Sequence, residues 1–170
     1  MEQPKPTEQH HKLEKLSGKW VGEEKIAGSP HTSETKATGT FEFRMDLGDL
    51  FAIVDYVEKS GGKTLMAGHG VIGWDTKKKN YTLHWFDTFG SPPGAPGAGE
   101  WEGDALKFHQ EGSGNTIFEL ADGGMNFTIE MDADGKGMKP IIVGKYRRAS
   151  AGRKVSEEDQ PEPDRVTARS

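Results

Sequence analysis

The sequence of 170 residues contains no cysteine. This absence excludes disulfide frameworks, thiolate metal sites, iron–sulfur clusters and cysteine nucleophiles, and it is typical of proteins in a reducing compartment. No run of residues approaches the ~20 apolar residues of a membrane-spanning helix. The first residues, Met1 to Pro6, lack the apolar stretch of a signal peptide. We therefore expect a cytoplasmic protein without a membrane partner.

The sequence also lacks a large excess of either sign of charge. The 22 lysines and arginines and the 27 aspartates and glutamates give a net charge of -5. The lysines and arginines do not form the long basic stripe that binding to a phosphate backbone requires, so nucleic acid is not an expected partner. The one basic run, Lys77 to Lys79, precedes Asn80 and a strand-like segment, which favours a solvated hairpin turn. The sequence does not indicate an oligomeric state.

Apolar residues make up 32% of the chain, which is enough for one core but not for two. We expect a flexible N-terminus over residues 1–6 and a single β-barrel domain over residues 7–148. After Arg148 the chain turns polar and charged, and Val155 and Val166 are its only sizeable apolar residues. This composition predicts a disordered tail over residues 149–170.

Helix signals are few. Thr7 can cap a short helix from Glu8 to Leu16, with Gly18 as a stop signal. From Trp20 onward, short runs of alternating apolar and polar residues are separated by Gly, Asp, Asn and Lys, which predicts strands joined by hairpins. The clearest run places Met125, Phe127, Ile129 and Met131 on one face. We count about ten such strands, all antiparallel.

Ten short strands with one helix fit either a two-sheet sandwich or a closed barrel. Glycines inside the strand-like runs favour the barrel, because sharp bends and close backbone approach require residues without Cβ. They are Gly22, Gly39, Gly68, Gly70, Gly73, Gly103 and Gly144. The predicted fold is all-β: an up-and-down, calycin-like or lipocalin-like barrel with a short N-terminal helix.

The run from Gly68 to Gly73 matches the G-x-G-x-x-G pattern of dinucleotide-binding folds. That pattern binds pyrophosphate only where the third glycine opens a helix, and here a turn and another strand follow Gly73. We interpret the glycines as a bent strand that packs beneath a large neighbour. His10 and His11 are adjacent on the expected helix and point about 100° apart, so they do not form a metal site. No cofactor and no metal are predicted.

Six residues are candidates for binding a ligand. Tyr81, Leu83, Trp85 and Asp87 follow one another on the inner face of one strand, so Asp87 lies near the barrel mouth. A loop rich in Gly and Pro, from Gly90 to Gly99, comes next and is expected to be exposed and mobile, and Trp101 follows it. Asp55 and Tyr56 form a second pair of a carboxylate and an aromatic residue. The candidates are Asp55, Tyr56, His69, Trp85, Asp87 and Trp101.

His69 and His84 lie on strands that we expect to be neighbours. His84 is expected on the outer face, because Tyr81, Leu83 and Trp85 occupy the other one. For His69 both faces of its strand are rich enough in apolar residues to be the inner one. The sequence contains no Ser/His/Asp order with a nucleophile elbow and no phosphate loop. It therefore predicts no reaction, and whether the protein is an enzyme stays open.

Several blocks of residues between Leu13 and Arg148 resemble a bacterial calycin-like barrel family known as domain of unknown function 1579. The blocks are Leu16 to Gly22, Thr38 to Phe41, Leu47 to Phe51, Asp55-Tyr56, Gly68 to Asp75, and Tyr81, Trp85 and Asp87. At Trp74-Asp75 similar sequences usually carry Tyr-Asp. The resemblance implies a barrel and implies no activity.

A more distant likeness is to nitrobindin, a ten-stranded haem barrel with the Gly-x-Trp-x-Gly start seen here from Gly18 to Gly22. The last expected strand, Lys139 to Arg148, has no histidine to serve as the iron ligand that nitrobindin carries near its C-terminus, which argues against haem. The leading hypothesis is a barrel that binds a small, largely apolar ligand in its interior. The alternatives are an enzyme with a His/Asp acid-base group in the cavity, and a protein-interaction or haem-binding barrel.

Overall fold

The computed structural model describes residues 2–149. The prediction of a disordered tail therefore falls outside the described residues, except for Ala149. The helices and strands of these residues are α1 (Glu8–Leu13), the 3-10 helix η1 (Glu14–Leu16), β1 (Gly18–Ile26), β2 (Thr35–Asp46), β3 (Phe51–Ser60), β4 (Lys63–Asp75), β5 (Asn80–Asp87), β6 (Gly97–Glu102), β7 (Ala105–Gln110), β8 (Gly114–Ala121), β9 (Gly124–Met131) and β10 (Lys139–Arg148).

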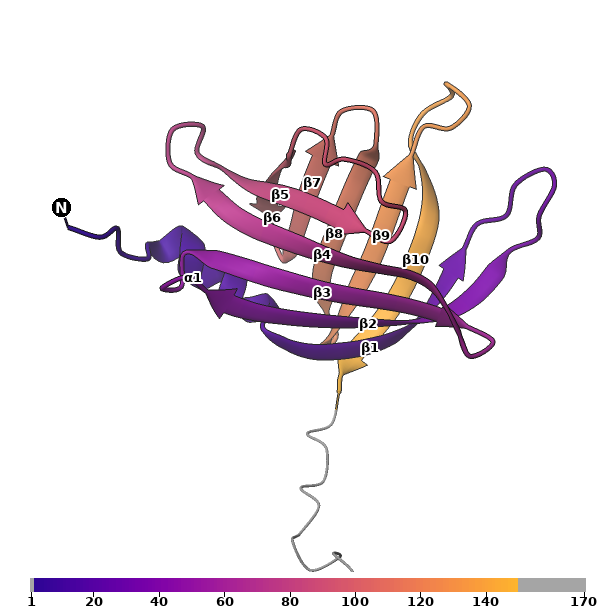
Figure 1. Ribbon diagram of the computed structural model, residues 1–170, viewed down its shortest axis with the longest axis horizontal. Coiled ribbons are helices and arrows are strands. Elements are labelled where there is room, and N and C mark those ends of the chain that lie inside the picture. The colour runs from indigo at the N-terminus through magenta and orange to yellow at the C-terminus, as the bar shows by residue number, and fades with distance from the viewer. Residues whose placement is uncertain (1, 150–170) are drawn as a thin grey trace, which may run out of the picture.

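The ten strands form a closed antiparallel barrel, which confirms the predicted fold class (Figure 1). Each strand pairs with the next one along the chain, and β1 closes the barrel by pairing with β10, from Trp20 opposite Arg148 to Ile26 opposite Ile142. Closure pairs each of the strands β1 to β10 on both sides, so none of them is an edge strand that could template aggregation. The order of strands is the up-and-down order that short hairpins between successive strands predict.

The two helical turns lie at one end of the barrel, which we call the helix end (Figure 1). Leu13 and Leu16 are fully buried there, and the indole N–H of Trp20 donates to the carbonyl of Leu16 over 2.8 Å. The hydroxyl of Tyr81 donates to the carbonyl of Gln9 over 2.7 Å. These contacts fix the helical segment against the barrel.

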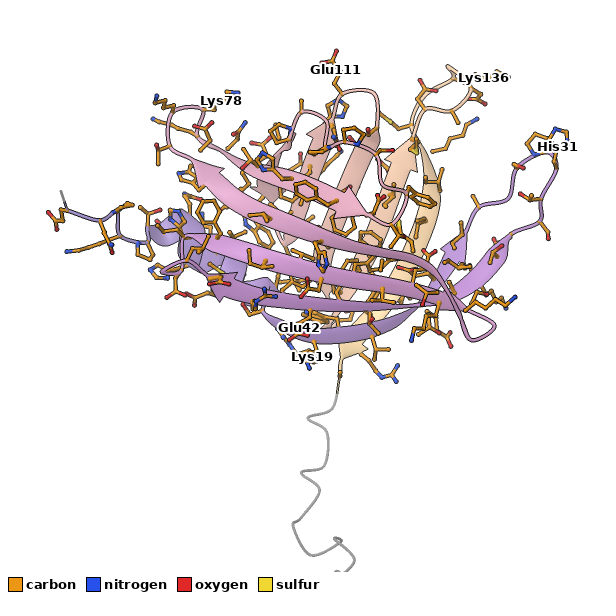
Figure 2. The ribbon with its side chains drawn as sticks, viewed as in Figure 1. Lys19, His31, Glu42, Lys78, Glu111 and Lys136 are labelled. Carbon is orange, nitrogen blue, oxygen red and sulfur yellow. The ribbon has the colours of Figure 1, made fainter. Side chains whose placement is uncertain are left out.

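We call the opposite end, where β1 leads to β2 and β3 leads to β4, the open end. Hairpins at this end extend away from the barrel body, and Figure 2 shows His31, Glu111 and Lys136 at three of their tips. The loop after β5 begins here as well. Its last three predicted loop residues, Gly97 to Gly99, belong instead to β6, because Gly97 pairs with Leu83 and Gly99 with Tyr81.

Aromatic side chains fill the middle of the barrel. Phe41 lies at their centre, with its ring centroid 4.5 Å from that of Tyr56, 4.9 Å from that of Phe127 and 5.1 Å from that of Tyr146. Pairs of this kind stabilise a core beyond the area that they bury. These rings belong to strands on different sides of the barrel and form one continuous core.

Candidate functional site

Two glutamates are buried inside the barrel towards the open end. Glu24 of β1 is 1% exposed and Glu58 of β3 is 4% exposed. The hydroxyl of Tyr56 lies 2.8 Å from Oε2 of Glu24 and 3.0 Å from Oε2 of Glu58, and the hydroxyl of Tyr146 donates to Oε1 of Glu24. Burial of a carboxyl group is costly unless partners of this kind satisfy it. We call these four residues the Glu-Tyr cluster.

Three glycines make room for the Glu-Tyr cluster. Gly22 of β1, Gly39 of β2 and Gly144 of β10 face the interior where a Cβ would meet the ring or hydroxyl of Tyr146, and at Gly39 and Gly144 also the side chain of Glu24. The sequence predicts close approach at these glycines from their position in strands. In the structure, the side chains of Tyr146 and Glu24 pack directly against the backbone of these glycines.

The hydroxyl of Tyr56 contacts two carboxyl groups. A hydroxyl group carries one proton and can donate it to only one of the two carboxyl groups that it contacts. The second contact is a hydrogen bond only while a carboxyl group of the pair is protonated and donates to the hydroxyl oxygen. The geometry therefore favours a protonated Glu24 below its raised pKa of about 7.

The electrostatics of the cluster explain this raised pKa. Burial raises the pKa of Glu24 from 4.5 to about 7, the hydrogen bonds from Tyr146 and Tyr56 oppose this shift, and the negative charge of Glu58 adds to it. Burial and the charge of Glu24 hold the pKa of Tyr56 and of Tyr146 well above their usual range, so both hydroxyls stay protonated. Near pH 7 the carboxyl oxygens of the cluster are therefore available as hydrogen-bond acceptors.

Three of the six predicted site residues come together here: Tyr56 belongs to the cluster, and Trp85 and Asp87 lie beside it. The indole of Trp85 lies 6.2 Å from the ring of Tyr56, measured between ring centroids, and donates to Oδ2 of Asp87 over 3.1 Å. A Cβ at Gly68 would overlap the indole of Trp85, and one at Gly70 would make a tight contact with it at 3.0 Å. The run from Gly68 to Gly73 is therefore a strand that packs beneath a large neighbour, as predicted.

Asp55 and His69 lie on the outer face of the barrel. The Nδ1 atom of His69 is 2.5 Å from Oδ1 of Asp55, and Arg44 donates to Oδ2 of the same carboxylate over 2.9 Å. The His69 side chain is 76% exposed. These two candidates do not face the interior where the ligand is expected, because Gly68, Gly70 and Ile72 take the inner face of β4. His84 is exposed on the outer face, as predicted.

Trp101 is separated from the other candidates. It lies on β6 close to the helix end, where the Lys15 amine is 5.6 Å from the centre of its ring. Its indole nitrogen is buried. The strand places Trp101 near the helical segment and away from the Glu-Tyr cluster.

The comparisons with known proteins agree with the fold. A family model described as "Protein of unknown function (DUF1579)" matches residues 5–148. The chain belongs to the DUF1579 family. The crystal structure of Rv2717c from M. tuberculosis is similar in fold, with a TM-score of 0.64 and 13% sequence identity, and the match covers 85% of this chain and 99% of that one. No curated protein sequence matches the chain.

Membership of the DUF1579 family leaves the function to be argued from the site. Among residues 2–149, no group of three or more His, Cys, Asp and Glu side chains is arranged to hold a metal ion. The helices in that part of the chain are too short and too polar to cross a membrane. The site of this DUF1579 barrel that the described residues define best is the Glu-Tyr cluster with its neighbours Trp85 and Asp87.

Sequence reasoning missed Glu24, Glu58 and Tyr146. The signal was present in the alternation of the strands: Trp20, Gly22 and Glu24 share one face of β1, and Tyr56 and Glu58 share one face of β3. Side chains that face inward recur at every second residue of a strand. Counting on in this way from Trp20 leads to Glu24, and from Tyr56 to Glu58.

Proposed function

We propose that this protein binds a small, largely apolar ligand at the open end of its barrel, with the polar end of the ligand against the Glu-Tyr cluster. The observation that carries this proposal is a pair of buried carboxyl groups next to half-buried apolar side chains. Met66 is opposite Glu58 in the sheet, and the ring of Trp85 is beside that of Tyr56. Both, like Ile129, are partly buried and pack against the core. Ligand sites of this kind combine an apolar wall with a few polar groups that fix orientation.

The polar end of the ligand is expected to donate hydrogen bonds. Glu24 and Glu58 present acceptors, and the two tyrosine hydroxyls have already committed their protons to them. An amine or an alcohol satisfies these acceptors, whereas a carboxylate would add a further negative charge beside them. The ligand is therefore a short amphiphile with a donor head, and the expected setting is the cytoplasm.

Two experiments test this binding function. Native mass spectrometry of the purified protein, followed by solvent extraction, should reveal a bound small molecule. Titration with decylamine, decanol and decanoate, followed by tryptophan fluorescence, should show binding of the amine and the alcohol in preference to the carboxylate. Trp85→Phe serves to identify the fluorescence change that comes from the open end. The change due to ligand beside Trp85 should disappear in this variant, whereas the fluorescence of Trp20, Trp74 and Trp101 remains.

The matched variants are Glu58→Gln, inside the barrel, and Glu130→Gln, which removes the same charge from a side chain that faces outward and accepts from Asn115. Glu58→Gln should lower the preference for decylamine over decanoate, and Glu130→Gln should leave it unchanged. Binding of decanoate as tightly as decylamine, or no binding of any of the three, contradicts the proposal.

A catalytic role of the same cluster is the second candidate. A carboxyl group with a pKa of about 7 is suited to transfer protons near neutral pH, and Glu24 has that property. In this candidate function Glu24 is the acid-base group of the cavity in place of a histidine, since His69 faces away from the interior. Mass spectrometry separates the two functions: a ligand recovered unchanged supports binding, and a conversion that Glu24→Gln abolishes supports catalysis.

A further inference from the structure

A groove with a volume of about 530 Å³ lies on the outer side of the sheet near the open end. It is formed where β1, β2 and β10 lie side by side and meet the turn between β3 and β4. Four lysines line it, namely Lys25, Lys36, Lys59 and Lys145, and all four are exposed. Glu24 of the Glu-Tyr cluster also contributes to the lining of this groove. The argument below rests on the four lysines, and it does not depend on the proposed function.

The lysines of this groove lack charge partners within residues 2–149. The ion pairs of that part of the chain use Lys5, Lys12, Lys19 and Lys139, together with Arg44 and two histidines, and none uses a groove lysine. The whole chain carries a net charge of -5. A concentration of positive charge in a concave site on an acidic protein focuses the electrostatic potential on an anion.

Two of the lysines repel each other across the sheet. Lys25 of β1 lies directly opposite Lys36 of β2, and like charges in this arrangement destabilise a pair of strands. A second row of outward-facing residues runs across β10, β1, β2 and β3. In it Glu23 lies opposite Lys145 on one side and Thr38 on the other, and Thr38 lies opposite Lys59. A bound anion would relieve the repulsion between Lys25 and Lys36.

We infer that this groove binds a small phosphate-bearing anion. Lysine amines bind phosphate as compact point charges, and four of them converge here from positions far apart in the sequence. The hydroxyl of Thr38 is a further donor in the lining, while Ser60 already donates to the carbonyl of Lys36 over 2.8 Å. The volume fits a small molecule. The lining contains two acids, the exposed Glu23 and the buried Glu24, and they are outnumbered by the four lysines.

Inorganic pyrophosphate is the probe, with inorganic phosphate as the weaker, less charged relative. Isothermal titration of the full-length protein at constant ionic strength should give saturable binding with one site, and binding should raise the midpoint of thermal unfolding. The double variant Lys25→Gln/Lys36→Gln should bind pyrophosphate about tenfold more weakly or worse. Without pyrophosphate it should be at least as stable as the natural protein, because the repulsion is gone.

The control variant removes the same charge elsewhere. Lys77→Gln/Lys78→Gln alters the turn between β4 and β5, and Figure 2 shows Lys78 on the opposite side of the molecule from His31, which marks the hairpin beside the groove. This control should bind pyrophosphate as the natural protein does. An equal loss of affinity in both double variants, or a response to sodium chloride equal to that to pyrophosphate, overturns the proposal.

A phosphate group could come from a soluble molecule or from a lipid headgroup, and vesicles containing phosphatidic acid distinguish the two. Retention on these vesicles that pyrophosphate competes away and that Lys25→Gln/Lys36→Gln abolishes supports the groove with a lipid as the source. No retention, together with saturable pyrophosphate binding, supports it with a soluble source. Retention that the double variant does not reduce, without pyrophosphate binding, contradicts it.

Discussion

Tyr56 and Glu24 are 32 positions apart in the sequence, yet the hydroxyl of Tyr56 lies 2.8 Å from a carboxyl oxygen of Glu24 inside the barrel. This contact joins β1 to β3 across β2, which lies between them in the sheet. It also links Glu24 to Glu58, since the same hydroxyl contacts both. Several measurable properties of the protein depend on this link.

The first prediction concerns stability and pH. The pKa of Glu24 is raised from 4.5 to about 7 in the folded protein, so the folded state holds a proton that the unfolded chain releases. The stabilisation is fully present below pH 4.5 and is lost as the pH rises through 7. The free energy of unfolding should fall over this window by at most about 3 kcal/mol.

Urea denaturation at several pH values measures this effect, and Glu24→Gln should flatten the profile because an amide does not titrate. Asp75 and Asp134 do not interfere, since their pKa values are lowered below 3.8 and they titrate under the window. Burial lowers the pKa of His10 below 6.5, which opposes the fall within the window, but His10 is present in both proteins, so the difference between their profiles reports Glu24. A profile for Glu24→Gln as steep as that of the natural protein would show that another group causes the pH dependence.

The second prediction concerns the hydroxyl of Tyr146. Tyr146→Phe removes a donor from a buried carboxyl group, which should lower the free energy of unfolding by about 1–3 kcal/mol at neutral pH. The same substitution in a Glu24→Gln background should cost less, because an uncharged amide depends less on that donor. A double-mutant cycle from urea denaturation measures the coupling, and strict additivity of the two substitutions would rule it out.

Much of the barrel could be predicted from local patterns, because strand alternation depends only on neighbouring residues. The inward face of β5, with Tyr81 and Leu83 buried, follows from period-two spacing. The packing of Trp85 over Gly68 and Gly70 follows from glycines within a strand. These features require no knowledge of what lies across the barrel.

The Glu-Tyr cluster could not be predicted in the same way. A carboxyl group in a core is unfavourable unless its donors are known, and the donors of Glu24 lie 32 and 122 positions away. The face of His69 stayed open for another reason: both faces of β4 carry apolar residues, so the alternation does not select the inner one. Pairing with Asp55 on β3 keeps His69 on the outer face.

The third prediction tests the room that Gly39 provides. A Cβ at this position would overlap the hydroxyl of Tyr146 and come within 2.8 Å of Oε1 of Glu24. Gly39→Ala should therefore lower the free energy of unfolding by about 1–3 kcal/mol. Tyr146→Phe removes the overlapped atom, so the two substitutions together should cost less than the sum of their separate effects.

Gly97→Ala is the matched control for that substitution. A Cβ at Gly97 finds its nearest atom, Cβ of Phe108, at 3.5 Å, an ordinary contact distance. Alanine also restricts the unfolded chain more than glycine does, so Gly97→Ala should leave stability unchanged or raise it by less than about 1 kcal/mol. Thermal unfolding of the two variants compares them directly, and an equal loss in both would mean that neither loss comes from the cluster.

The last prediction separates the outer pair from the inner site. Asp55 and His69 are 37% and 76% exposed, and ion pairs so open to water contribute little to stability. His69→Ala should change the free energy of unfolding by less than about 1 kcal/mol and leave ligand binding at the open end intact. Tyr56→Phe, one position along from Asp55 but facing inward, should reduce both stability and binding, because it removes the hydroxyl shared by Glu24 and Glu58. Urea denaturation and the decylamine titration measure both effects, and loss of decylamine binding in His69→Ala with binding intact in Tyr56→Phe would move the functional site to the outer face of the barrel.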